Sequence, residues 1–320
     1  MNSCINCGTL IGPLADPLNA RCSACGTPQD SLWMKARGPC NRVTYIGERS
    51  AGKTCLLAAQ QRALYDDLST EWPGSEVFPL TWDALELVEE NTKALKSGVV
   101  PDATPAVFAS PAALHVKTPL HSANIVFHDL AGEVFDTEPG YLSHGAFVTL
   151  PSTTVFLISL SELGDARDAL RGLINRYRLA IARLWRGSRR NGLVVVFTKF
   201  DRMLDWFSDA RWENIRYYLD GLTGPSLRSP GAYWNNMQYI SASLRSFLVD
   251  HLSGRDFVDA ADRDFRTVVY CAVSALGSEP TADGRLAGPL ASKRVLDPLF
   301  AVMMLNAPWP TRWRLKLGSR

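Results

Sequence analysis

The chain has 320 residues, of which 46% are hydrophobic and 21% charged, and a formal net charge of +2. These proportions are those of an ordinary soluble globular protein. A net charge so close to zero excludes wholesale electrostatic binding to nucleic acid or to an acidic membrane, so any such contact would need a local patch.

The N-terminal stretch, MNSCINCG, lacks the apolar core of a signal peptide, and no apolar run approaches the roughly 18 residues of a membrane-spanning helix. We therefore expect a cytoplasmic protein. Its seven cysteines should then be reduced, because that compartment does not support structural disulfides.

Four cysteines fall in two similar turns, CINCG at 4–8 and CSACG at 22–26. A CxxC turn presents two thiolates to one ion, and two such turns complete a tetrahedral site. The pattern predicts structural zinc bound by Cys4, Cys7, Cys22 and Cys25. A redox pair would need a thioredoxin-like helix, which nothing in the sequence indicates.

Residues 1–30 are predicted to be a separate zinc ribbon, because their apolar runs are too short to build a core without the metal. Arg21 is the only lysine or arginine among them. A surface that follows a phosphate backbone is therefore not indicated, and docking of a protein is favoured over nucleic acid.

The rest of the chain alternates predicted strands and helices up to residue 306. Strands are expected at 42–47, 112–117, 124–129, 153–160, 192–198 and 267–274. Helices are expected at 53–66, 81–97, 165–186, 208–222 and 290–306, the last with Pro298 as a kink or a new start. This order predicts an α/β domain at 41–306, with a mostly parallel sheet covered by helices on both faces.

Two segments, near 66–100 and 223–262, are expected to be insertions into this domain. Residues 307–320 form a basic and aromatic tail, WPTRWRLKLGSR. Such a tail could lie on a membrane surface or on RNA through charge and stacking, but a frayed or docked C-terminus is the preferred interpretation.

The stretch GERSAGKT, residues 47–54, fits GxxxxGK[ST] between a predicted strand and a predicted helix. Glycines let successive amides turn toward a polyphosphate, the lysine reaches the outer phosphates and the threonine hydroxyl ligates Mg²⁺. The residues expected to contact nucleotide here are Gly47, Ser50, Ala51, Gly52, Lys53, Thr54 and Cys55, with Lys53 also catalytic and Thr54 also a magnesium ligand.

A second carboxylate follows in NIVFHDLAGE, residues 124–133. Asp129, at the end of an apolar strand, can hold Mg²⁺ through water. The amide of Gly132 can contact the outermost phosphate, so loss of that phosphate would release the loop that follows.

Together, GERSAGKT, DLAGE and TKFD resemble the first, third and fourth motifs of the Ras-like, translation-factor-related P-loop GTPase superfamily. The resemblance implies that Asp201 accepts hydrogen bonds from the ring NH and amino group of guanine and that the stem of Lys199 packs along the base. Thr198 stands where asparagine is commoner. Chemistry favours guanine as well, because adenine lacks the paired donors that a carboxylate accepts.

The same resemblance implies a switch threonine that closes on Mg²⁺. Thr104 in PDATPAVF is the preferred residue and Thr118 the alternative. Glu133 occupies the place of the glutamine that orients the attacking water, and a carboxylate beside a charged phosphate predicts slow hydrolysis. Arg49 could approach the phosphates, although a surface arginine is the simpler interpretation.

A base-contacting SA[KL] motif is also expected after the last strand. Ser274 and Ala275 fit the order, because an apolar strand precedes them and the last helix follows. Ser241 with Ala242 is the alternative, but the sequence around them is more typical of an inserted helix.

These interpretations predict a GTP-binding regulatory switch that uses Mg²⁺, hydrolyses GTP slowly and signals to protein partners. The alternatives are a P-loop ATPase or kinase-like enzyme, and a zinc-ribbon nucleic-acid adaptor with a structural nucleotide. A zinc ribbon before the P-loop domain and RVLDPLF near its end are similar to the double-GTPase families of bacterial multicomponent conflict systems. That similarity implies partners within a multicomponent system.

Overall fold

The computed structural model describes residues 2–11, 21–48, 50–101, 111–119, 121–129, 153–159, 168, 170–172, 174–175, 190–220 and 230–308. Its strands are β1 (Asn2–Ser3), β2 (Leu10–Ile11), β3 (Cys40–Ile46), β4 (Glu76–Pro79), β5 (Ala112–Lys117), β6 (Ser122–Asp129), β7 (Thr153–Ser159), β8 (Arg190–Thr198) and β9 (Phe265–Ala272). Its α-helices are α1 (Ser31–Lys35), α2 (Lys53–Asp66), α3 (Leu68–Glu71), α4 (Trp82–Lys96), α7 (Glu213–Asp220), α8 (Pro230–Asp250), α9 (Arg255–Asp264) and α10 (Asp297–Asn306). Two 3₁₀ helices, η4 (Phe200–Phe207) and η5 (Ala210–Trp212), follow β8.

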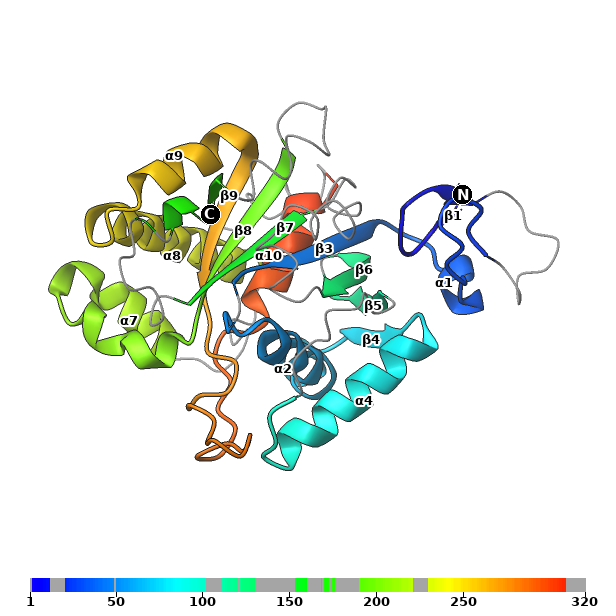
Figure 1. The fold of residues 1–320 in the computed structure, drawn as a ribbon, viewed down its shortest axis with the longest axis horizontal. Coiled ribbons are helices and arrows are strands. Elements are labelled where there is room, and N and C mark those ends of the chain that lie inside the picture. The colour runs from blue at the N-terminus through cyan, green and yellow to red at the C-terminus, as the bar shows by residue number, and fades with distance from the viewer. Residues whose placement is uncertain are drawn as a thin grey trace.

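The centre of the molecule is a seven-stranded sheet in the order β4-β5-β6-β3-β7-β8-β9 (Figure 1). The neighbours β6, β3, β7, β8 and β9 are parallel, whereas β4 and β5 are antiparallel additions at one edge. The predicted α/β class with a mostly parallel sheet is therefore confirmed. Among the described residues, no helix is long and apolar enough to cross a membrane.

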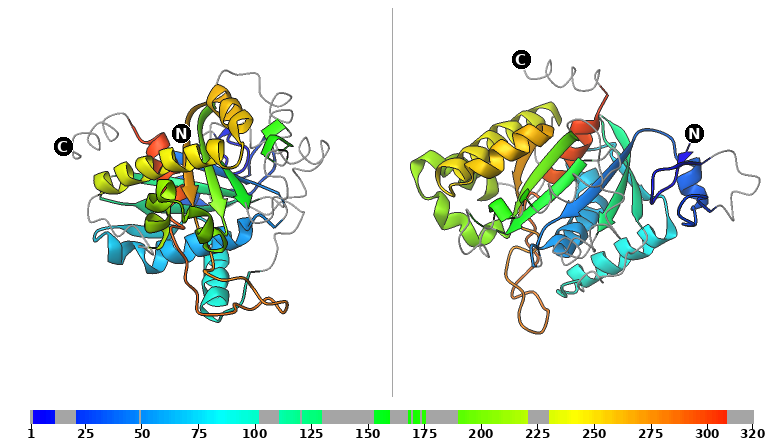
Figure 2. Two further views of the ribbon diagram at one scale, coloured as in Figure 1. Left: turned by 90° about the vertical axis from the view of Figure 1, so that its left-hand side faces the viewer. Right: turned by 45° about the horizontal axis from the view of Figure 1, so that its top comes forward.

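Both faces of the sheet are buried, which explains why its central strands are apolar throughout. On one face, Val194 and Val196 of β8 share a core with α2, α4 and α10. On the other, Val195 and Phe197 pack with α7, α8 and α9. The two sets of helices lie on opposite sides of the strands in Figure 2.

The cysteine-rich N-terminal segment packs directly against the sheet. Trp33 of α1 and Ile5 form a small core with Leu80, Ala113 of β5 and Val126 of β6. The guanidinium of Arg42, on β3, donates to the backbone oxygens of Ile5 and Cys4. The division into a ribbon at 1–30 and a GTPase domain at 41–306 stays a prediction, but the two parts share packed residues.

The structure differs from the sequence-based expectations at several boundaries. Residues 66–100, predicted to be an insertion, contain the edge strand β4, which was not expected, and the helix α4, which packs on α2 and agrees with the helix expected at 81–97. The last helix begins at Asp297 with Pro298 in its first turn, so Pro298 marks a new start and not a kink. Most of the helix expected at 165–186 and the tail from 309 lie outside the described residues.

Candidate functional site

The predicted nucleotide-binding residues follow the carboxyl ends of neighbouring strands. Asp129, the last residue of β6, lies opposite Tyr45 near the end of β3. Ile46, the last residue of β3, lies opposite Phe156, and β7 continues beyond it to Ser159. Thr198 ends β8 opposite Ser159. In an open α/β sheet this edge is where ligands bind.

The phosphate loop leads from β3 into α2 through two left-handed residues, Ser50 with φ 63° and Gly52 with φ 80°. Gly47 lies so close to β7 that a β-carbon there would meet the backbone oxygen of Leu157 at 2.8 Å. The Lys53 ammonium donates to the carbonyls of Gly47 at 2.8 Å and Glu48 at 3.0 Å. The lysine is therefore held against the loop that it is predicted to serve.

The N-terminus of α2 suits an anion. The helix has 14 residues, begins at Lys53 and carries no acidic residue in its first turn. Its Gly52 N-cap has no side chain to satisfy the first amides. Amides and helix dipole together favour a phosphate at this position.

Thr198 joins the predicted base motif to the phosphate loop. Its hydroxyl donates to the backbone oxygen of Ala51 at 2.8 Å, and Thr198 is 3% exposed. Lys199 follows with φ 55° and caps η4, whose first turn contains Asp201. The two motifs are thus one connected structure, in which Thr198 supplies the link.

Ser274 and Ala275 lie beside this motif. The preceding Val273 donates from its amide to the oxygen of Phe197 at 2.9 Å and accepts from the Phe200 amide at 3.2 Å. The alternative residue, Ser241, is on α8, where its hydroxyl accepts from the Tyr270 amide at 2.8 Å and covers the outer edge of β9. This placement favours Ser274 and Ala275 for contact with a base.

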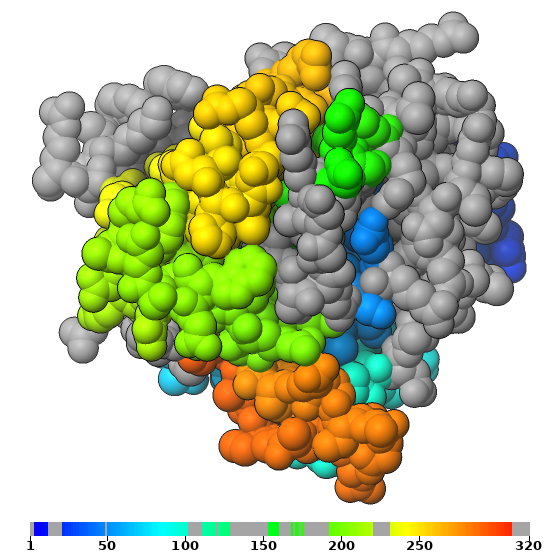
Figure 3. Space-filling model, turned by 60° about the vertical axis from the view of Figure 1, so that its left-hand side comes forward, coloured from blue at the N-terminus to red at the C-terminus, as the bar shows by residue number. Residues whose placement is uncertain are grey.

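Chain segments that are distant in sequence lie side by side near the predicted base motif (Figure 3). The lime-green residues of η4 and α7 lie directly above the orange residues of the loop that follows β9. An ion pair between Arg202 and Glu279, at 3.2 Å, connects the two. Glu279 therefore lies beside η4, which contains Asp201 of the predicted base motif.

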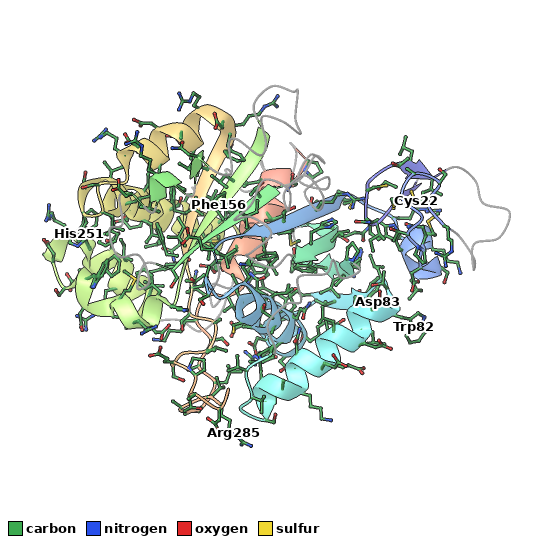
Figure 4. All side chains as sticks on the ribbon, in the orientation of Figure 1. Cys22, Trp82, Asp83, Phe156, His251 and Arg285 are labelled. Atoms are coloured by element: carbon green, nitrogen blue, oxygen red, sulfur yellow. The ribbon has the colours of Figure 1, made fainter. Side chains whose placement is uncertain are left out.

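The four ribbon cysteines form one cluster, with their Sγ atoms within 4.8 Å of one another. Cys4 and Cys25 are 3.6 Å apart, and Cys7 and Cys22 are 3.5 Å apart. Four thiolates around zinc, with Zn–S bonds of about 2.3 Å, would be separated by about 3.8 Å, so the cluster fits a tetrahedral ion. Figure 4 places Cys22 at the far end of the molecule from His251, which directly follows α8.

Two matching turns build this cluster. The amides of Gly8 and Gly26 donate to the oxygens of Cys4 and Cys22 at 3.0 and 2.8 Å. Both glycines are left-handed, with φ of 73° and 72°. That backbone conformation is readily adopted only by glycine, which explains the residue that follows each CxxC.

The thiols of the cluster differ in acidity. Burial raises the pKa of Cys4 to about 12. Burial also acts upward on Cys25, but hydrogen bonds with Thr27 and with neighbouring thiols outweigh it and lower the pKa to about 6. A divalent cation would displace the protons that such a cluster retains.

Three residues near the sulfurs were missed by the sequence-based prediction. The hydroxyls of Thr9 and Thr27 lie 3.2 Å from the sulfurs of Cys7 and Cys25. The amide of Gln29 donates to Cys4 Sγ at 3.3 Å. The repeated hexapeptide CxxCGT was the available signal for the two threonines, whereas nothing in the sequence marked Gln29.

Comparison with known proteins identifies the chain. The family model Double-GTPase 2 matches residues 41–224, more than half of the 320 residues. The chain belongs to the Double-GTPase 2 family. It is accordingly a P-loop protein that binds GTP, which sets aside the ATPase and kinase alternatives.

Structural neighbours of this Double-GTPase 2 protein are distant. A nucleolar GTP-binding protein 1 from Plasmodium falciparum has 12% identity and a TM-score of 0.36, with coverage of 89% of this chain and 95% of that one. A Roco2 protein of Methanosarcina barkeri bound to GDP has 14% identity and a TM-score of 0.26, with coverage of 58% and 44%. No curated protein matches. The family assignment therefore rests on the family model.

The remaining predicted residues are placed only in part. Thr104, Gly132, Glu133 and Arg49 lie outside the described residues, as does the side chain of Asp129. Thr118 bonds with His121 in the turn after β5. Because β5 is antiparallel to β6, that turn lies at the amino end of β6, away from the phosphate loop.

Cys55 lies on the first turn of α2 close to the predicted base motif. Burial raises the pKa of its thiol, and the positive charge of Lys199 opposes this shift. The hydrogen bond from Thr198 to Ala51 places the residue before Lys199 beside the loop that precedes this helix.

Proposed function

We propose that this Double-GTPase 2 protein is a regulatory switch that binds Mg·GTP, hydrolyses it slowly and reports its nucleotide state to a protein partner. The observation that best supports the proposal is the hydrogen bond of 2.8 Å from Thr198 to the oxygen of Ala51. It joins the residues predicted to read guanine to the loop predicted to hold the phosphates. A nucleotide bound at this edge would contact both.

Hydrolysis would proceed by attack of water on the γ-phosphorus. The new P–O bond forms while the bond to the β–γ bridging oxygen breaks, GDP leaves with that electron pair and the water protons pass to phosphate and solvent. Lys53 and the loop amides would stabilise the developing charge. Mg²⁺, when bound, would neutralise charge on the β- and γ-phosphates, held by Thr54, Asp129 and Thr104.

The proposed switch consists of the segments that contain Thr104 and Gly132. Asp129 ends β6 opposite Tyr45, close to the phosphate loop, and β5 begins at Ala112 opposite Phe127. Both segments therefore adjoin described strand ends near the γ-phosphate position. Glu133 in place of a glutamine favours slow turnover without an activator.

Nucleotide selection tests the guanine assignment. Purified protein should carry GDP or GTP, and Asp201→Asn should weaken GDP binding about tenfold to a hundredfold, the value of a charged hydrogen bond. The variant should gain affinity for xanthosine diphosphate, because its amide donor matches the oxygen that replaces the amino group of guanine. Equal binding of ADP and GDP by the wild type would contradict the proposal.

The cysteine cluster is proposed to hold one zinc ion and to build a surface for a protein partner in a multicomponent system of a bacterial cytoplasm. Large apolar side chains are exposed on this segment and on the start of α4 next to it, with Leu10 and Trp82 each 66% exposed and Leu32 48% exposed. The Trp82 amide donates to Asp30 beside α1 at 3.2 Å. Salt-dependent binding of RNA or DNA that disappears in Leu32→Asp would instead favour a nucleic-acid adaptor.

A further inference from the structure

The loop after β9 is closed at its base by backbone pairing. Residues 275–293, here called the excursion, leave the sheet after Ser274 and return at Lys293. Ser274 donates to Lys293 at 3.0 Å and accepts from it at 2.8 Å. The Ser292 hydroxyl donates to the oxygen of Ala275 at 2.7 Å. The position of Ser274 and Ala275 therefore depends on where the chain returns.

A buried polar cluster sets that point of return. Arg294 and Asp297, whose side chains are 0% and 2% exposed, pair at 2.9 Å through Nε and Oδ2. Tyr218 of α7 and Tyr233 of α8 both donate to the Asp297 carboxylate, and Arg294 donates to the Tyr218 hydroxyl. The guanidinium also lies 3.9 Å from the centre of the Tyr218 ring.

The backbone conformation of Arg294 indicates that the buried pair fixes the shape of this turn in addition to filling the core. Its φ of 58° is left-handed, a conformation that non-glycine residues adopt only when their surroundings enforce it. Buried ion pairs add little net stability over apolar residues of similar volume, and their best-attested use is to select one arrangement. Here the arrangement selected is the turn that carries Lys293 back to Ser274.

The amide of Ala275 is a suitable donor for a base. Ala275 accepts from Ser292, but no described residue accepts from its N–H. Val273, two residues before Ala275, is hydrogen-bonded through its backbone to Phe197 and Phe200. This segment therefore lies beside Lys199 and Asp201. If Asp201 accepts from N1 and the 2-amino group of guanine, the O6 carbonyl needs a donor on this side.

We infer that Arg294 and Asp297 are positioning residues for guanine recognition: through Lys293 and Ser274 they hold the Ala275 amide where O6 of the base would lie. The inference rests on the guanine recognition proposed above. It assigns Tyr218 and Tyr233 the role of fixing this pair from α7 and α8. The excursion extends from this anchored base to its tip near Arg285 (Figure 4).

The test compares two altered guanines, because each removes a different contact. The 6-thio analogue of GDP replaces O6 with a weaker acceptor, whereas inosine diphosphate lacks the 2-amino group that Asp201 would read. Affinities are measured by competition with a fluorescent GDP. The wild type should prefer GDP over the 6-thio analogue by about threefold to tenfold and over inosine diphosphate by more, from the values of neutral and charged hydrogen bonds.

Arg294→Met should reduce the preference over the 6-thio analogue to about one and leave the preference over inosine diphosphate unchanged. Tyr218→Phe keeps the ring but removes the hydroxyl shared with Arg294 and Asp297, so it should also reduce the preference for GDP over the 6-thio analogue. This variant tests the inference if Arg294→Met does not fold. Ser241→Ala is the matched control, because it removes a buried bond to β9 at Tyr270. It should keep both preferences.

The outcomes are distinct. Retention of both preferences in the Arg294 and Tyr218 variants, or an equal loss of both, would show that the pair only stabilises the fold and would overturn the inference. A wild type with no preference over the 6-thio analogue would overturn it too. A wild type that binds ADP as well as GDP would refute guanine recognition itself, and the inference with it.

Discussion

Replacement of Gly47 by alanine tests whether the phosphate loop is closed tightly over β7. The added β-carbon would lie 2.8 Å from the Leu157 oxygen, 3.1 Å from the Leu157 β-carbon and 3.2 Å from the Ala51 β-carbon. The nearest atom is backbone in β7, which pairs with both β3 and β8 and cannot shift alone. Overpacking of this kind costs about 1–3 kcal/mol.

We therefore expect Gly47→Ala to lower the free energy of unfolding by about 1–3 kcal/mol, or to displace the loop and weaken GDP binding about tenfold or more. Urea unfolding and GDP titration measure the two effects. Gly288→Ala is the matched control, because a β-carbon there meets nothing within 4 Å. Unchanged stability and unchanged GDP affinity in Gly47→Ala would refute the reasoning.

Three further changes test other contacts of the site. Thr198→Val should lower the free energy of unfolding in urea by about 1–3 kcal/mol, because the buried Ala51 oxygen loses its donor. Thr198→Ser should retain the hydrogen bond, so equal losses of stability in both variants would count against the link. Metal analysis of protein purified without chelator should find about one zinc per chain. The Cys22→Ser variant should contain no bound zinc. A metal-free wild type would contradict the prediction. Arg42→Met should speed zinc release about tenfold, measured with a metal indicator, because it removes the donor to the backbone oxygen of the ligand Cys4. Arg245→Met, a surface control, should not.

The parts of the fold that depend on local sequence were predictable. The phosphate loop and the helix at 53–66 agree with the sequence prediction, because glycines, the motif and helical periodicity occur together there. The four cysteines were grouped by spacing alone. Strand β4, EVFP, was missed because a short run ending in proline gives no periodic signal, and its place is set by pairing with β5.

The buried cluster at Arg294 could not have been predicted from its local sequence. In RVLDPLF, an arginine and an aspartate three residues apart resemble an exposed pair on a helix. Their burial depends on Tyr218 and Tyr233, which precede them by more than 60 residues. Long-range packing of this kind has no signal in a single sequence.

Backbone strain connects the parts of the candidate nucleotide site. Among the described residues, Ser50, Lys199, Ser253 and Arg294 are the non-glycine residues with positive φ. Ser50 is in the phosphate loop, Lys199 in the base motif and Arg294 next to the residue that pairs with Ser274; only Ser253 lies elsewhere, between α8 and α9. Each such residue costs on the order of 1–3 kcal/mol and persists only where its surroundings over-determine it. Three of the four strained residues therefore lie in or next to the proposed nucleotide site, as expected if that site is preorganised.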